Sequence, residues 1–202
     1  MTIKRQTSAI AALSANGLGA ALTSTGASYV LTANDAGDSL GHLITIKGNA
    51  ATNHSGKTFT IAGTDENGRP LSEGIAGPNG AVTVTSTKYF ATVATITPSA
   101  STGADTFDMG WTASAVSPWY QVNLNTALPM NIGIGSSVTT GSPNYTMQRT
   151  YDGSVWFDDS TITGKTASFD GTHTIPCMAL RMKYTVTGTV SHTFIQHDKF
   201  GQ

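Results

Sequence analysis

The chain has 202 residues, a formal net charge of −1 and only 11% charged residues, against roughly 25% in ordinary soluble domains. This balance leaves no basic field for phosphates, which argues against DNA or RNA as a partner. The single cysteine, Cys177, excludes an internal disulfide and a cysteine-based zinc cluster, and we interpret it as a small buried residue beside a strand. No apolar run reaches the length of about 18 residues that a membrane span needs.

Threonine is unusually frequent, with 33 residues, and Gly, Ser and Ala fill much of the remainder. Thr suits a pleated, half-exposed surface and Gly suits tight turns, so the composition predicts an all-β fold whose surface carries hydroxyls rather than charges. We predict two antiparallel β-sandwich domains, Ig-like or jelly-roll-like, at residues 26–115 and 116–202, preceded by an N-terminal arm at residues 1–25.

The predicted arm lacks the alternation of a strand. Ser8 is suited to cap a short helix that ends at Asn16 and Gly17, but two turns are marginal without a packing partner. We therefore expect either a flexible terminus or an arm ordered against another subunit. The candidate contact residues of this arm are Lys4, Arg5, Ile10 and Leu13.

Residues 51–58, ATNHSGKT, satisfy a loose form of the phosphate-binding P-loop, with Ala51 in place of the first glycine. That loop works between a strand and a helix, whose amides face the phosphates. Here Phe59 and Ile61 alternate with smaller residues, and turn signals follow within ten residues. We therefore predict a loop that enters a β-strand at Lys57, and no nucleotide cofactor.

Short alternating segments separated by Gly, Pro and Asn fill the rest of the first domain. Asn67-Gly68 predicts a hairpin turn, and Phe107, Met109 and Trp111 share one face of a strand. Spacing of about ten residues per strand is typical of sandwiches and barrels. The predicted strands are 42–47, 57–63, 71–77, 81–97 and 105–112.

A proline-containing stretch places the domain change near residues 113–117, and alternation resumes beyond it. Asp152-Gly153 predicts a second hairpin turn. In residues 177–186, the apolar Leu180 and Met182 oppose Arg181, which makes this segment the clearest amphipathic strand. The predicted strands of the second domain are 131–135, 144–151, 154–159, 177–186 and 189–197.

Residues that could carry catalysis form no recognisable set, so we predict no enzymatic activity, no cofactor and no metal site. Asp158 and Asp159 are adjacent, which sends their side chains to opposite faces of a strand. Asp35 and Asp38 lie in ANDAGDS, which favours a turn over a Ca²⁺ site. The histidines match no metal-binding or Ser-His-Asp spacing; they are His42, His54, His173, His192 and His197.

The aromatic residues are candidates for contacts. Trp111 and Trp156 fit sandwich cores better than sugar-stacking platforms, because the residues around them alternate. Trp119 follows Pro118 and is less clearly buried. We therefore take Trp119 and Tyr120 as candidate contact residues for a domain, a subunit or a sugar.

The segment FTIAGTDENGRPLSEGIAGPNGAVTVTSTKYFATVATIT, residues 59–97, resembles a module of structural proteins in tailed-bacteriophage virions. The similar order continues in PWYQVNLN (118–125), NYTMQRTYD (144–152) and ALRMKYT (179–185), so that about two thirds of the chain is covered. Gly74 departs from the β-branched residue that this family favours, which weakens the strand around it. The resemblance implies a decoration-type particle protein built of β-sandwich domains.

The expected function is therefore that of a virion structural protein, bound to the capsid as a decoration or cement subunit. Its expected partners are the major capsid protein or other virion proteins and further copies of itself, with no nucleic acid and no membrane. A tail-side adaptor, tube-associated or fibre-base protein is the alternative within this class. A carbohydrate- or receptor-binding module is the alternative outside it.

Overall fold

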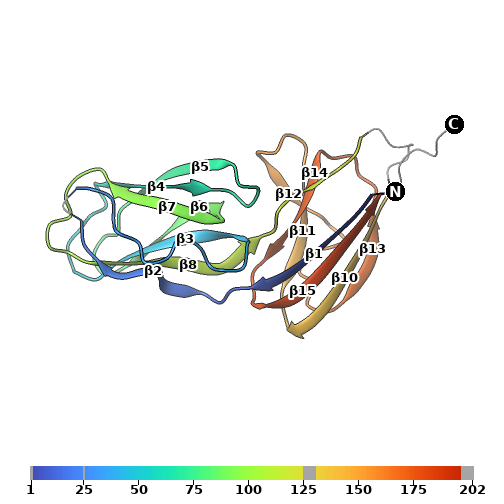
Figure 1. Cartoon of the computed structure of the whole chain (residues 1–202), viewed down its shortest axis with the longest axis horizontal. Helices are drawn as coiled ribbons and strands as arrows, with labels where there is room; N and C mark the ends of the chain where they lie inside the picture. Colours follow the sequence, from blue (N-terminus) through green and yellow to red (C-terminus); the bar gives the residue numbers. More distant parts are fainter. Residues whose placement is uncertain (1, 25, 125–130, 197–202) are drawn as a thin grey trace. The chain divides into compact units, whose positions relative to one another are not determined.

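The computed structural model describes residues 2–24, 26–124 and 131–196, which form fifteen β-strands (Figure 1). The prediction of an all-β fold is confirmed. Since the described residues contain no helix, none of them forms a helical membrane span. The chain divides into two compact units: unit 1 comprises residues 1–10 and 117–202, and unit 2 comprises residues 11–116.

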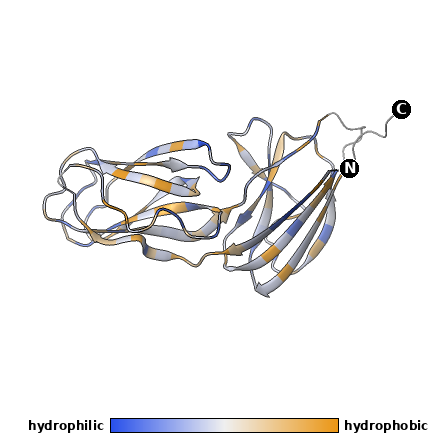
Figure 2. Ribbon diagram, viewed as in Figure 1, coloured by the Kyte–Doolittle hydropathy of each residue, from blue (hydrophilic) through white to orange (hydrophobic). Residues whose placement is uncertain are grey.

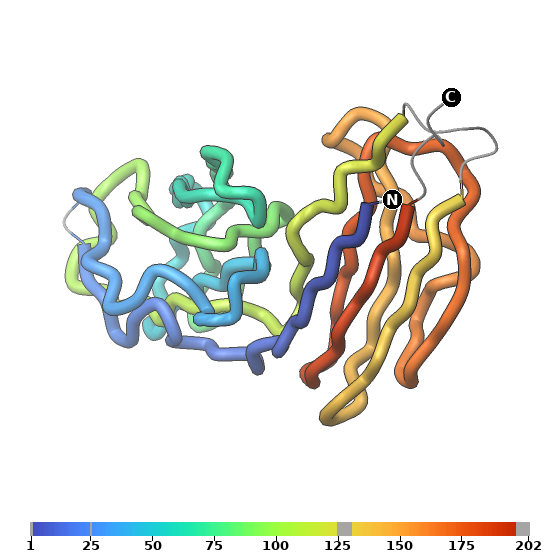
Figure 3. The backbone as a smooth tube through the Cα atoms, turned by 45° about the vertical axis from the view of Figure 1, so that its right-hand side comes forward, coloured from blue at the N-terminus to red at the C-terminus, as the bar shows by residue number. Residues whose placement is uncertain are grey.

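Unit 1 is built from two antiparallel sheets. In the first, strands distant in the sequence lie side by side in the order β1-β15-β10-β13 (Figure 3); these are β1 (Thr2–Ile10), β15 (Gly188–Gln196), β10 (Ile132–Gly141) and β13 (Phe169–His173). The second has the order β12-β11-β14, with β9 beside β14; these are β12 (Trp156–Asp158), β11 (Tyr145–Thr150), β14 (Ala179–Tyr184) and β9 (Tyr120–Gln121).

The core of unit 1 lies between its two sheets. Buried positions alternate with less buried ones along β10 and β15, as the period-two pattern predicts. Figure 2 shows hydrophobic bands interrupted by more hydrophilic ones along the strands of this sheet. Tyr145 and Tyr184 of one sheet pack on His192 of the other, with ring centroids 5.2 and 5.9 Å away. Tyr120 stacks on Phe194 at 5.0 Å. Both sheets therefore contribute inward side chains to one packed interior.

Unit 2 has the same two-sheet construction. Its first sheet has the order β8-β3-β6, with β2 beside β8; the strands are β2 (Ser14–Leu22), β8 (Phe107–Val116), β3 (Gly41–Gly48) and β6 (Thr83–Phe90). Its second sheet has the order β5-β4-β7, formed by β5 (Pro70–Ala76), β4 (Thr58–Thr64) and β7 (Thr92–Pro98). Phe59 and Ile61 of one sheet and Ile46, Phe107 and Met109 of the other share one buried cluster.

The N-terminal segment differs from the prediction. No short helix follows Ser8; residues 2–10 form β1, which pairs with β15 from Thr2 opposite Gln196 to Ile10 opposite Gly188. Residues 14–22 form β2, so that the segment predicted as one arm belongs to two sheets. The alternation of β1 was obscured because this edge strand points Lys4, rather than an apolar residue, toward the interior.

Three other details refine the predicted strands. Residues 81–97 form two strands in different sheets, β6 and β7, because the chain changes sheet at Ala91. Gly74 is paired opposite Thr60 although it lacks a β-branched side chain. On the polar face of β14, Arg181 is buried rather than open to solvent, and Lys183 is partly buried.

Candidate functional site

In the loop that resembles a P-loop, the Lys57 side chain is bound by other residues of unit 2. Lys57 Nζ donates a hydrogen bond to the Ser101 carbonyl at 2.7 Å and lies 3.1 Å from His54 Nδ1. His54 Nε2 in turn lies 2.8 Å from Asp105 Oδ2. The chain passes directly from Lys57 into β4, which confirms the predicted loop entering a strand. The lysine therefore ties two loops of unit 2 together.

The ANDAGDS segment forms a turn, as predicted. Asp38 accepts hydrogen bonds from the amides of Ala11 and Leu40, at 2.9 and 3.0 Å, and lies 2.8 Å from His42 Nε2. Burial disfavours the charged carboxylate, but these hydrogen bonds outweigh it and lower the pKa of Asp38. Across residues 2–24, 26–124 and 131–196, no group of three or more His, Cys, Asp or Glu side chains is placed to hold a metal ion.

A chain of three buried polar groups in unit 1 has no counterpart in the sequence prediction. His173 Nδ1 lies 3.0 Å from Asp159 Oδ2, where an N–H donates to the carboxylate, and His173 Nε2 lies 3.7 Å from Cys177 Sγ. Amides of Thr161 and Ile162 also donate to Asp159. Burial disfavours its charge, but the hydrogen bonds from the amides and His173 lower the pKa of Asp159.

This order of groups is that of a nucleophile, a base and an orienting carboxylate. The Cys177 side chain is only 3% exposed, however, and burial raises the pKa of its thiol to about 11. At neutral pH the sulfur is therefore protonated, and it is buried away from any substrate. We interpret the three groups as a structural link between β13 and its neighbouring loops. The interpretation of Cys177 as a buried residue beside a strand is confirmed. No known sequence motif has the spacing of Asp159, His173 and Cys177, so the sequence alone does not predict that these residues meet.

His192 is a second buried imidazole. Its Nδ1 lies 2.8 Å from the Ser136 hydroxyl, and its Nε2 has no hydrogen-bond partner among the described residues. Burial lowers its pKa to about 3, so the ring is neutral at physiological pH. His197 lies outside the described residues.

The predicted contact residues of the N-terminal segment are separated by the strand geometry. Lys4 is half-buried and donates a hydrogen bond to the Trp119 carbonyl, and burial lowers its pKa. Arg5 is exposed on the opposite face of β1. Ile10 is buried in the core, whereas Leu13 lies between strands and is 62% exposed. Of this set, Arg5 and Leu13 are accessible.

The predicted aromatic contacts are also placed differently from one another. Tyr120 is 3% exposed and donates from its hydroxyl to Gln196, so it offers no stacking surface. Trp119 is half-buried and packs edge-on against Trp156, with ring centroids 5.0 Å apart. Trp156 is not a core residue, because it stacks on the Arg181 guanidinium at 4.0 Å on the other face of its sheet. Trp111 packs against the core of unit 2, as expected.

Asp158 and Asp159 bind different partners, as adjacent strand residues should. Gln148 Nε2 donates to Asp158 Oδ1 at 2.7 Å, whereas Asp159 binds His173. The two carboxylates therefore do not form the converging pair that glycoside hydrolysis needs.

One accessible sheet face of unit 2 carries hydroxyls and small residues rather than charges. Outward positions of β5, β4 and β7 in unit 2 are all small and uncharged, and we call this set the threonine face. It consists of Thr58, Thr60, Ala62, Ser72, Gly74, Ala76, Thr95 and Thr97.

Many cations are bound within their own unit instead of standing free in solvent. Their partners are backbone carbonyls, carboxylates, an amide oxygen and aromatic rings. These cations are Lys4, Lys57, Arg69, Lys88, Arg149, Lys165 and Arg181.

No protein-family model matches the sequence, and the search of curated proteins found no match.

Proposed function

We propose that this chain is a structural protein of a tailed-bacteriophage virion, attached to the outside of the capsid as a decoration or cement subunit. It acts by adhesion rather than turnover. Bound copies favour the assembled shell, because any ligand that binds the assembled state alone stabilises it by mass action. Many weak contacts on one particle reinforce each other through their high effective concentration.

The observation that carries the proposal is the uncharged character of the threonine face. Seven cations are bound within the two units, and the eight positions of that face include no charged side chain. When another protein covers such a face, no charged side chain has to be desolvated, so the free-energy cost of burying it is small. We assign it as the contact with the shell.

The sequence resemblance supports the same proposal from a second direction. Residues 59–97, which resemble the virion module, run from β4 to β7 and contain the three strands of the sheet that bears the threonine face, apart from the end residues Thr58 and Pro98. The segment that resembles the virion module therefore forms the sheet that we propose as the contact surface.

Imaging of phage particles that carry a tagged copy tests the assignment. We expect the label to cover the head. A label confined to the tail transfers the protein to a tail-side adaptor, tube-associated or fibre-base role, and its absence from particles refutes a virion role.

A substitution tests the contact surface itself. Thr60→Lys places a charge in the centre of the threonine face and should reduce occupancy on stripped particles at least tenfold. Thr163→Lys, at an exposed loop of unit 1, is the matched control. Equal occupancy of the two variants contradicts the assignment of this face.

A further inference from the structure

Two glycines of unit 1 have no structural explanation. A Cβ added at Gly135 would meet no atom within 4 Å, and one at Gly133 would meet its nearest atom, of Ile195, at 3.8 Å. By contrast, a Cβ at Gly63 or Gly110 would lie 1.9 Å from a backbone oxygen. Within the described strands, Gly133 and Gly135 alone combine this open space with an ordinary φ. Glycine weakens a strand interior and often marks the close approach of a ligand.

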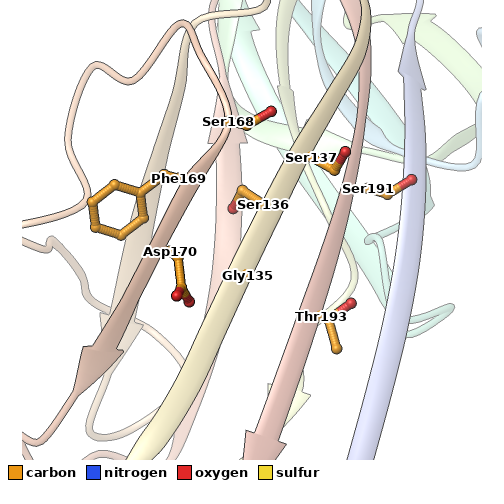
Figure 4. A pocket seen from close by; sticks show the side chains of 8 residues that line it. All are labelled: Gly135, Ser136, Ser137, Ser168, Phe169, Asp170, Ser191 and Thr193. Carbon is orange, nitrogen blue, oxygen red and sulfur yellow. The ribbon is translucent and has the colours of Figure 1, made fainter.

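Gly135 forms the floor of a furrow in the outer face of the first sheet of unit 1, and Gly133 lies two residues before it on the same face. Gly135 lies opposite Thr193 of β15 on one side and Asp170 of β13 on the other. In the next row Ser137 lies opposite Ser191. With Ser168, these side chains line an open, shallow hollow of about 470 Å³ (Figure 4).

The chemistry of the furrow walls selects a class of ligand. Serine and threonine hydroxyls both donate and accept hydrogen bonds, whereas the Asp170 carboxylate only accepts. Asp170 is the one charged side chain that lines the hollow, so it disfavours sulfated, sialylated or phosphorylated ligands. Phe169 points away from the hydroxyls (Figure 4), and Lys165 Nζ lies 4.8 Å from its ring centroid. Binding therefore depends on hydrogen bonds rather than on aromatic stacking.

We propose that this furrow binds a neutral oligosaccharide, with the sugar hydroxyls bonded to Ser137, Ser191, Thr193 and Asp170 over the glycine floor. From position 135 to position 137 the floor extends about 7 Å along the strand. A single furrow without an aromatic platform gives weak binding, with a Kd on the order of millimolar. Many copies on one particle or bead convert this into measurable avidity. The inference does not depend on the virion proposal.

An oligosaccharide array with the full-length chain displayed on beads tests the inference. The array contains glucose, galactose, mannose and N-acetylglucosamine oligomers, together with sialylated and sulfated ones. We expect at least one neutral oligomer to bind. Gly135→Val fills the furrow with a strand-favouring side chain whose Cβ would meet no atom within 4 Å, and Asp170→Asn removes the charge-assisted hydrogen bonds. Each should weaken binding tenfold or more.

The control variant is Ala9→Val, which adds a comparable side chain to an exposed position of β1 outside the furrow. It should bind like the wild type. Unfolding curves check that all variants are folded. The inference is overturned if no neutral oligomer binds, if Gly135→Val binds as well as Ala9→Val, or if only anionic glycans or extended peptides compete for the furrow.

Discussion

Acid should destabilise unit 1 through His192. The ring is fully buried between Tyr145 and Tyr184, and the neutral Ser136 hydroxyl faces its Nδ1. Burial lowers its pKa from 6.5 to about 3. Between these two values the unfolded chain binds a proton that the folded chain excludes, so stability is complete above pH 6.5 and falls as the pH drops toward 3.

The size of the effect follows from the two pKa values. Each unit of pKa difference corresponds to about 1.4 kcal/mol, so the free energy of unfolding should fall by about 2 kcal/mol between pH 7 and pH 5. This is a large part of the 5–15 kcal/mol that typically holds a domain folded. Paired carboxylates such as Asp159 have lowered pKa values and contribute mainly below pH 4, so measurements at pH 5 and above avoid their titration. A comparison chain without His192 subtracts the contribution of the other histidines.

Urea unfolding at pH 7, 6 and 5 measures this loss. The fluorescence of Trp119 and Trp156 reports on unit 1 when Trp111 is replaced by Phe. The comparison chain carries Ser136→Ala and His192→Phe together, so that removal of the imidazole leaves no buried hydroxyl without its partner. Its free energy of unfolding should vary at least 1.5 kcal/mol less between pH 7 and pH 5. Parallel pH dependences of the two chains refute a buried neutral His192.

Three further outcomes follow from the packing. Gly63→Ala should lower the free energy of unfolding by about 2 kcal/mol or more in urea titrations, because the added Cβ would lie 1.9 Å from the Thr92 carbonyl oxygen. Cys177 should resist a thiol-specific disulfide reagent at pH 8 until urea unfolds unit 1, since its thiol is buried with a raised pKa; rapid labelling of the folded chain would contradict its burial. Asp38→Asn should destabilise unit 2 by about 1–3 kcal/mol at pH 7, and this difference should shrink below pH 4 as the lowered pKa of wild-type Asp38 is approached. A pH-independent difference would contradict a charged Asp38 carboxylate stabilised by its hydrogen bonds.

The sequence predicted those strands whose inward positions are apolar. Residues 42–47 and 105–112 were recognisable because Ile44, Ile46, Phe107 and Met109 recur at every second position. The strand at residues 2–10 was missed because Lys4, Gln6 and Ser8 occupy its inward positions. These polar residues are tolerated since the Lys4 ammonium reaches a carbonyl and the Ser8 hydroxyl accepts from Tyr184. Their partners lie more than one hundred residues away.

The contacts among the buried polar groups of unit 1 could not be predicted from the sequence either, because the partners are again separated in the chain. Three separate segments supply Asp159, His173 and Cys177, and folding alone brings them together. The furrow did leave a signal in the sequence. In NIGIG the isoleucines face inward, so the alternating Gly133 and Gly135 face outward, where a side chain would encounter no obstacle.

The split of unit 1 between residues 1–10 and 117–202 constrains how the chain matures on the ribosome. Unit 2 is uninterrupted in sequence, so it can fold while the remainder is still being translated. β1 must wait until β15 has been synthesised, because Thr2 is paired with Gln196. A prematurely terminated product would therefore retain a sound unit 2 and display an unsatisfied strand edge, which quality-control proteases and chaperones recognise.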